Sequence, residues 1–381
     1  MIPSTLQSED AYYSYSKKGP KVLNGMCIDI HKGVKSAILG ANGAGKSTLF
    51  SVLNALYKPE KGTILFDGKP LSYRHRGILK MRAKVSILFQ NPNDMMFKPY
   101  VEQDVAYGPE NLKLSKDEVE ERVNDALFSV GMQDFRKQPI MKLSYGQRKR
   151  VTLAGVLAMR PDVLIMDEPT AGLDPQMAYE VMEIAEQLHS SGVTVIMSSH
   201  DTDLTYAWAD EIHVLNGGKC IYSGAPEAFY DDRKVSQKAG LLPPSVFQMN
   251  KTLTETGKCD LLPYPKTQTQ MSVKMSGCRD RDFGTLHVIK ASEGVNPVTL
   301  IEEKGLQEMP KGLFGLSARA AHDQYGFDVD FLYNGPENCI MKCLSGHDSV
   351  LVCDPLMFEK AEASAEFINN NGFGKIKIDL I

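Results

Sequence analysis

Short, wholly apolar runs alternate with amphipathic stretches between about residues 22 and 230. Ala37-Ile-Leu39 and Val163-Leu-Ile-Met166 are such runs, without the apolar–polar alternation of a strand that faces water on one side. Continuous apolar runs of this length are typical of strands buried on both faces, and the amphipathic stretches between them are typical of helices that cover a sheet. The pattern predicts an α/β domain with a largely parallel sheet.

Short sequence motifs predict where several helices and strands begin or end. Ser115 and Glu118 have the spacing of a capping box, which predicts the start of a helix. The pair Asp174-Pro175 predicts another helix start, because Asp is a good N-cap and Pro needs no N–H donor at the first helical position. The Asn-Gly-Gly sequence at 216–218 lies between two β-rich runs and predicts a hairpin.

The texture of the chain changes after about residue 242, where Pro, Thr, Lys and Gln become frequent and apolar periodicity fades. We therefore expect a first domain over residues 1–265, a linker over 266–283 and a small α+β domain over 284–381. The last segment predicts a βαββαβ order of the ferredoxin-like kind, with strands at 285–290, 328–333, 339–344 or 349–353, and 375–380, and helices at 316–325 and 356–370.

Composition narrows the class of protein. The chain has 381 residues, with 43 Lys+Arg against 47 Asp+Glu, so it lacks the basic surplus of a general nucleic-acid binder. The apolar runs fall well short of the roughly 20 residues of a membrane-spanning helix. The N-terminus lacks the order of a secretory signal, and seven cysteines fit reduced thiols better than a disulfide framework. We expect a cytosolic globular protein that does not bind nucleic acid.

A glycine-rich motif follows the apolar run at 37–39. It matches G-x-x-x-x-G-K-[ST] in the strand-then-helix context of a phosphate loop. The glycines let backbone N–H groups converge on phosphate oxygens, the lysine adds a mobile positive charge, and the first hydroxyl is a natural Mg²⁺ ligand. The phosphate-binding residues are expected to be Gly40, Asn42, Gly43, Gly45, Lys46, Ser47 and Thr48.

Two acids end the apolar run at 163–166. Asp167 and Glu168 are expected at the carboxyl edge of a central strand, where open α/β sheets bind ligands. Beside a phosphate loop, Asp167 is expected to hold Mg²⁺ and Glu168 to act as general base toward water.

The ordered set of motifs resembles that of the ATP-binding-cassette ATPases over about residues 10–260. Beyond the phosphate loop and the acids, the chain carries Phe89-Gln90-Asn-Pro92 for the glutamine loop, Leu143-Ser144-Tyr145-Gly146-Gln147 for the signature, Asp167–Asp174 for the acid strand and D-loop, His200 for the switch histidine, and Tyr15 for the aromatic that stacks on adenine. Tyr145 departs from the commoner glycine of the signature.

The resemblance implies an ATP hydrolase that uses Mg²⁺ and works as a head-to-tail dimer. It assigns Glu168, His200 and Gln90 to catalysis, and Ser47, Gln90 and Asp167 to the metal. It also implies that the phosphate loop of one subunit and the signature of the other enclose each ATP. The signature residues concerned are Ser144, Gly146 and Gln147, and Asp174 couples the two sites.

The segments at 90–97 and 143–161 are similar to the energy-coupling-factor group, especially its cobalt-uptake ATPases. This similarity implies import of a transition-metal ion, most directly cobalt, through separate transmembrane scaffold and substrate-binding subunits, with the chain at the cytoplasmic face of the membrane as a homodimer. Nickel or a vitamin is the alternative cargo, and a soluble ATPase acting on nucleic acid or ribosomes is the alternative class. Apolar contacts to the scaffold are expected from Met95, Met96, Phe97 and Tyr100. The alternative is that these four are ordinary core residues of the nucleotide-binding domain.

The tail is the part that the motifs explain least. Cys339, Cys343, His347 and Cys353 suggest a metal-sensing site, although free cysteines are commonly structural core residues and that alternative is favoured. Residues 315–319 suggest anion binding at a helix N-terminus, with a solvated Arg319 as the alternative. We expect the tail to regulate the ATPase or to stabilise a dimer.

Overall fold

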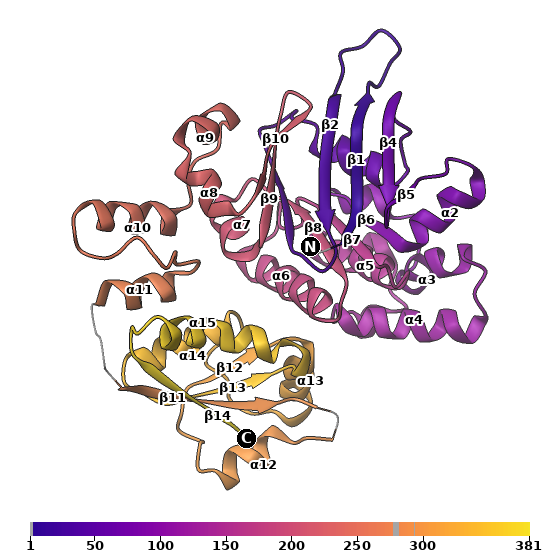
Figure 1. Ribbon diagram of the computed structural model, residues 1–381. Coiled ribbons are helices and arrows are strands. Elements are labelled where there is room, and N and C mark those ends of the chain that lie inside the picture. Colours follow the sequence, from indigo (N-terminus) through magenta and orange to yellow (C-terminus); the bar gives the residue numbers. More distant parts are fainter. Residues whose placement is uncertain (1–2, 277–281, 293) are drawn as a thin grey trace. The chain divides into compact units, whose positions relative to one another are not determined.

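The computed structural model describes residues 3–276, 282–292 and 294–381. The chain divides into two compact units (Figure 1). Unit 1 comprises Met1–Ala178 and Gly192–Leu242, and unit 2 comprises Tyr179–Ser191 and Pro243–Ile381. The division after Leu242 coincides with the change in sequence texture and precedes the expected domain boundary at residue 265.

A six-stranded sheet forms the centre of unit 1. Its order is β10-β9-β3-β8-β7-β6, and every neighbouring pair is parallel except β9 with β10. The predicted parallel sheet and the predicted hairpin are therefore confirmed. The strands are β3 (Ser36–Leu39), β6 (Val85–Leu88), β7 (Val163–Asp167), β8 (Thr194–Ser198), β9 (Glu211–Asn216) and β10 (Lys219–Gly224).

A second, antiparallel sheet completes unit 1, in the order β2-β1-β4-β5 (Figure 1). One hydrophobic cluster joins this sheet to the central sheet and to the helix that follows the phosphate loop, through residues such as Met26, Phe50 and Ile165, all of which are fully buried. The strands are β1 (Ser4–Tyr13), β2 (Leu23–His31), β4 (Lys61–Phe66) and β5 (Lys69–Pro70).

Both helices whose starts were predicted from the sequence begin there, α4 (Lys116–Ser129) after Ser115 and α6 (Pro175–Ser190) after Asp174. The Ser115 hydroxyl accepts from the Glu118 N–H at 3.2 Å, and the Asp174 carboxylate accepts from the Met177 N–H at 2.9 Å. The helix α6 begins in unit 1 and belongs to unit 2 from Tyr179 onward. The other helices and turns of unit 1 are α1 (Lys46–Leu53), α2 (His75–Lys84), η1 (Pro92–Met95), α3 (Val101–Asn111), η2 (Gln133–Phe135), η3 (Ile140–Lys142), α5 (Tyr145–Leu157), α7 (Thr202–Trp208), α8 (Pro226–Asp231) and α9 (Arg233–Ala239).

Unit 2 contains a four-stranded sheet in the order β12-β13-β11-β14, and all three pairings are parallel. Separate hydrophobic clusters cover its two faces, one with α11, α14 and α15 and the other with α12 and α13. The elements are β11 (Asp282–Lys290), β12 (Lys311–Phe314), β13 (Ser349–Cys353), β14 (Lys375–Leu380), α10 (Ser245–Glu255), α11 (Gln268–Ser276), α12 (Pro297–Glu303), α13 (Leu316–Tyr325), α14 (Gly335–Leu344), η4 (Pro355–Met357) and α15 (Phe358–Asn370).

The C-terminal α/β region is confirmed, but its ferredoxin-like order is wrong because the sheet is wholly parallel. Residues 339–344 end the helix α14, which begins at Gly335-Pro336 and buries Cys339, Ile340 and Cys343 at helical spacing. Residues 328–333 make only an isolated bridge, from Phe331 to Gly312. The strand that replaces them, β12, has four residues and leaves little periodicity to detect.

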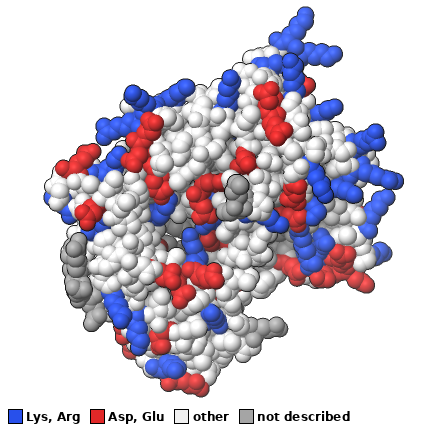
Figure 2. Space-filling view, viewed as in Figure 1, with Lys and Arg blue, Asp and Glu red and all other residues white. Residues whose placement is uncertain are grey.

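The expected linker at 266–283 contains α11, in which Met271 and Val273 are 2% exposed. Residues 277–281 lie outside the described residues. Among the described residues, no helix combines the length and the apolar character needed to cross a membrane. On the face in view, Lys and Arg side chains are interspersed with Asp and Glu side chains, in keeping with the near balance of 43 and 47 (Figure 2).

Candidate functional site

The carboxyl ends of four parallel strands bring the motif residues to one edge of the central sheet. The phosphate loop follows β3, Gln90 follows β6, Asp167 and Glu168 end β7, and His200 follows β8. This edge is where an open α/β sheet presents loops to a ligand. The sequence motifs are thus collected at one site by the fold.

The phosphate loop has the backbone that its glycines predict. Gly45 lies at φ +103°, and a Cβ on Gly40 would stand 2.5 Å from the Leu215 carbonyl oxygen. Lys46 is 7% exposed and donates from Nζ to the Gly40 carbonyl at 2.7 Å. Burial lowers the pKa of Lys46, while the negative charges of Glu168 and Asp167 act in the opposite direction. The Lys46 side chain therefore folds back over the phosphate loop, and its ammonium group lies near Asp167 and Glu168.

Asp167 and Glu168 are held by a residue that the motifs did not identify. The Ser198 hydroxyl donates to Asp167 Oδ1 at 2.6 Å and accepts from the Glu168 N–H at 3.0 Å. Ser198 pairs with Asp167 in the β7–β8 register. The sequence offered one signal for Ser198: it is a polar residue at the end of an apolar strand, and that strand neighbours the one that carries the acids.

The Glu168 carboxylate lies between the two other residues expected in catalysis. Gln90 Nε2 donates to Glu168 Oε2 at 3.0 Å, and His200 Nε2 lies 2.6 Å from Glu168 Oε1. Glu168 itself has φ +47°, a left-handed conformation that is costly for a residue with a Cβ. The structure thus brings Gln90, Glu168 and His200 together from three different strands.

Tyr15 lies beside the helix that follows the phosphate loop. Its hydroxyl is 2.8 Å from Thr48 Oγ1, and its ring makes edge contacts with Tyr13 and Tyr57 at centroid distances of 5.4 and 5.9 Å. Tyr15 is 64% exposed, whereas Tyr13 is partly buried and stacks on Tyr57. An exposed ring next to Thr48 is suited to stack on a planar base.

The signature residues open α5 and make a complete capping box. The Ser144 hydroxyl accepts from the Gln147 N–H at 3.2 Å, and Gln147 Oε1 accepts from the Ser144 N–H at 2.9 Å. Since its oxygen accepts, the Ser144 hydroxyl keeps its own hydrogen for another acceptor. A Cβ on Gly146 would stand 2.1 Å from the Met177 sulfur, so a side chain at this position would require the flexible end of Met177 to move.

Tyr145, the departure from the family signature, packs against the D-loop. A Cβ on Gly172 would lie 3.4 Å from the Tyr145 ring, and Gly172 has φ +74°. The tyrosine therefore fills space over a glycine turn. It leaves the Ser144 and Gly146 positions unchanged.

The oxygen donors at the site suit a hard cation. Ser47 is exposed at the start of α1, Asp167 is a carboxylate, and Gln90 donates through Nε2, which leaves its amide oxygen as the ligand atom. Mg²⁺ is commonly bound by one or two protein oxygens together with phosphates and waters. Among the described residues, no group of three or more His, Cys, Asp or Glu side chains could hold a metal by itself.

The cysteines of unit 2 do not converge with His347. Cys339, Cys343 and Cys353 are completely buried, whereas His347 is exposed. Burial raises the pKa of Cys339 to about 12 and raises that of Cys353 as well. Neutral, buried thiols behave as small hydrophobic residues, so the geometry favours the structural alternative.

Arg319 is mostly buried and faces a carboxylate of the chain itself. Within unit 2 its Nη2 lies 2.5 Å from Glu183 Oε2, and its guanidinium stacks 4.8 Å from the centre of the Tyr333 ring. Glu183 itself is 11% exposed at the side chain. Both expectations for residues 315–319 are therefore replaced by an internal ion pair.

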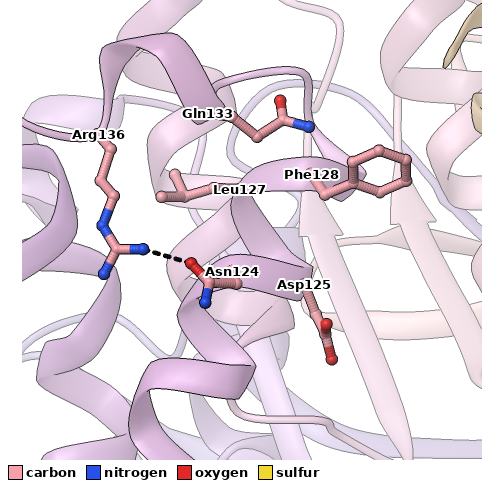
Figure 3. Close-up of a pocket in the computed structure, with 6 residues that line it drawn as sticks. All are labelled: Asn124, Asp125, Leu127, Phe128, Gln133 and Arg136. Carbon is pink, nitrogen blue, oxygen red and sulfur yellow. Dashed lines mark hydrogen bonds between the residues drawn. The ribbon is translucent and has the colours of Figure 1, made fainter.

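A surface pocket of about 380 Å³ lies elsewhere in unit 1, beside α4 and η2. Figure 3 shows Arg136 bonded to Asn124 at its wall. None of the phosphate-loop, acid or signature residues lines it. The lining residues are Asn124, Asp125, Leu127, Phe128, Gln133 and Arg136.

Known proteins are similar in sequence to most of the chain. A family model described as ABC transporter matches residues 23–171. The chain is 35% identical over 359 residues to the energy-coupling factor transporter ATP-binding protein EcfA2 of Methanospirillum hungatei, covering 91% of this chain and 89% of that protein. It is 43% identical over 253 residues to the corresponding EcfA of Methanococcus maripaludis, covering 66% and 91%.

Solved structures agree in fold. The structure of cbiO1 from Clostridium perfringens, described as part of the ABC transporter complex cbiONQ, matches with TM-score 0.56 and 39% identity over 67% of this chain and 98% of that one. The dimeric ATP-binding cassette MJ0796, bound to ADP and Pi, matches with TM-score 0.52 and 23% identity over 58% and 98%. The second likeness supports the fold alone.

Proposed function

Because the chain belongs to the family of energy-coupling factor transporter ATP-binding proteins, within the ATP-binding-cassette ATPases, it is an ATP-hydrolysing transporter subunit, and we propose that it powers import of Co²⁺. The observation that carries the proposal for hydrolysis is the position of the Glu168 carboxylate between Gln90 Nε2 at 3.0 Å and His200 Nε2 at 2.6 Å. In this position Glu168 is the general base that accepts a proton from the attacking water. Gln90 and His200 orient its two oxygens.

The phosphate loop binds the triphosphate at the amino end of α1. Backbone N–H groups of residues 40–48 and the Lys46 ammonium neutralise the β- and γ-phosphates, and Tyr15 stacks on the adenine. Lys46 is preorganised there by its bond to the Gly40 carbonyl. ATP phosphates offer stronger, charged acceptors than this carbonyl.

Mg²⁺ would be held by Ser47, Asp167 and Gln90, and it would supply electrostatic stabilisation of the charge that develops on the transferred phosphoryl group. Asp167 is fixed for this role because Ser198 donates to its Oδ1 at 2.6 Å. A preset carboxylate does not have to reorganise when the metal and nucleotide arrive.

Two protomers would complete two sites as a homodimer. The signature at 144–147 of one protomer would cover the γ-phosphate bound by its partner's phosphate loop, with the Ser144 hydrogen and the Gly146 backbone as donors. Asp174, the last residue of the D-loop, caps the start of α6 and would lie at the contact between the two sites. Closure of the dimer then depends on the γ-phosphate, and hydrolysis releases it.

The proposed cargo rests on two similarities. Residues 90–97 and 143–161 resemble cobalt-uptake ATPases, and the chain is 39% identical to cbiO1, a part of the complex cbiONQ. Transmembrane scaffold and substrate-binding subunits would form the path for the ion. The chain would bind them from the cytoplasmic face of the membrane as a peripheral subunit.

Vesicles that contain the reconstituted complex test the cargo. With ATP on the side of this subunit, we expect accumulation of radiolabelled Co²⁺ that exceeds that of Ni²⁺, because the resemblance is to the cobalt-uptake group. Nickel or vitamin uptake without cobalt uptake would contradict the cargo. ATP turnover stimulated by DNA or ribosomes, without a membrane partner, would instead favour the soluble class of ATPase.

The glutamine-loop region offers an apolar surface to the membrane scaffold. Phe97 is 63% exposed and Tyr100 is 43% exposed, whereas Met95 and Met96 are partly buried. Phe97 also stacks on Tyr107 at 5.1 Å between centroids. Two exposed aromatic rings just after Gln90 are suited to anchor a partner helix and to report its movement to the site.

Phe97→Ala should weaken this contact. We expect at least about a fivefold loss of the subunit co-purified with the tagged scaffold, because truncating an aromatic anchor costs more than 1 kcal/mol at many interfaces. Phe128→Ala, which changes another exposed phenylalanine (47%) on α4, is the matched control. Equal retention of both variants would exclude Phe97 from the interface.

A further inference from the structure

A lysine on α5 reaches the turn that follows the acid strand. Lys149 is 1% exposed, and its Nζ donates to the backbone carbonyls of Glu168 at 3.3 Å and of Ala171 at 3.2 Å. The two acceptors lie at the ends of one turn, since the Ala171 N–H also donates to the Glu168 carbonyl at 3.1 Å. Lys149 is therefore a bridge between the signature helix and the catalytic turn.

This turn needs support because Glu168 is strained. Its φ of +47° is unfavourable for a residue with a Cβ, and the following Pro169 further restricts the residue before it. Ser198 fixes the N–H of Glu168 at 3.0 Å, and Lys149 fixes its carbonyl. With both peptide groups held, the direction of the Glu168 side chain toward Gln90 and His200 is set.

The buried charge of Lys149 is costly, which argues for a role beyond filling space. Burial lowers its pKa to about 8, and the negative charge of Glu168 partly offsets this effect. The side chain is thus largely protonated near neutral pH, with its donors directed at carbonyl oxygens. Apolar packing at the same interface is already supplied by Tyr145 over Gly172 and by Met177 against Gly146.

We propose that Lys149 is a positioning residue for ATP hydrolysis, which holds the backbone of Glu168 in its left-handed conformation and ties it to the signature helix. The inference rests on the proposed function, in which Glu168 serves its own protomer's nucleotide and Ser144 serves the partner's. Lys149 would then make the two half-sites of one protomer move together.

Lys149→Met tests the proposal in the full-length chain, because methionine has a similar volume but no donor. We expect kcat for ATP to fall about 10- to 100-fold while KM changes less than about threefold, since the phosphate loop is untouched. Hydrogen exchange of the backbone amides at 170–174 should quicken about tenfold or more, with residues 40–48 unchanged. Thr152→Val is the matched control: it removes another buried hydrogen bond on α5, from Thr152 Oγ1 to the Lys149 carbonyl at 2.8 Å.

Lys149→Gln and Glu168→Gln are measured in parallel. Glutamine keeps an amide donor at a shorter reach, so its kcat should lie between those of the wild type and Lys149→Met. If Lys149→Met keeps the wild-type kcat and the wild-type rates of hydrogen exchange, the proposal is overturned. If the methionine variant does not fold, the same result in Lys149→Gln overturns it. Full activity of Glu168→Gln would instead overturn the assignment of the base, and so the two failures are distinguishable.

Discussion

Lys46→Ala should abolish ATP turnover, with a loss of at least about 100-fold in kcat/KM. The substitution removes a charged donor that is already held over the phosphate loop by the Gly40 carbonyl at 2.7 Å. Charge-assisted hydrogen bonds to phosphate are about twice as strong as neutral ones, and a 100-fold loss corresponds to about 2.7 kcal/mol at the transition state. Initial rates over a range of ATP concentrations measure the effect.

Lys61→Ala is the control for Lys46→Ala, because Lys61 is exposed on β4. It should leave turnover unchanged. In the reconstituted complex, Lys46→Ala should also stop cobalt accumulation. Cobalt uptake at the wild-type rate in this variant would show that transport does not depend on this ATPase, and it would contradict the proposed function.

Glu168→Gln should bind ATP normally and hydrolyse it at least about 100 times more slowly. The amide is nearly isosteric with the carboxylate, so the Ser198 and Lys149 contacts to the backbone remain, but the proton acceptor is lost. Because the γ-phosphate stays intact, a dimer closed around ATP should accumulate. Sedimentation with ATP, with ADP and without nucleotide should show the dimer in the presence of ATP only.

Glu9→Gln, an exposed change on β1, is the control for that variant and should hydrolyse ATP like the wild type. A Glu168→Gln sample that remained monomeric with ATP, both alone and with the membrane subunits, would contradict the proposed clamp. Rapid hydrolysis by the same sample would place the general base elsewhere.

The site at the carboxyl edge of the central sheet could be predicted from the sequence, because the motifs that form it each end or follow an apolar run. Asp167 ends such a run, and the phosphate loop follows another, so their meeting at one edge requires only a parallel sheet. The supporting residues were harder to identify. Ser198 and Lys149 act on neighbours 31 and 19 residues away. A serine at the end of a strand and a lysine in a helix show no sign of a role until the fold brings them to the acids.

Unit 2 shows how a short helical pattern can be misinterpreted as a strand. The apolar positions at 339, 340 and 343 fit one face of a helix, and Pro336 in the first turn of α14 supports that assignment, yet the segment is short enough to be interpreted as a strand. β12 is only four residues long and is buried on both sides, so it shows no alternation. The sequence analysis correctly favoured Cys339 and Cys343 as core residues, but the strand that it predicted for their segment is a helix.

The strand order of unit 2 also has a consequence for synthesis of the chain. β11 lies inside its sheet between β13 and β14, and both of these neighbours are encoded later, with β14 at Lys375–Leu380. The nascent β11 therefore cannot pair on both sides until β14 has been synthesised. The residues of unit 1 end at Leu242, so all residues of the ATPase core have been synthesised well before the sheet of unit 2 can be completed.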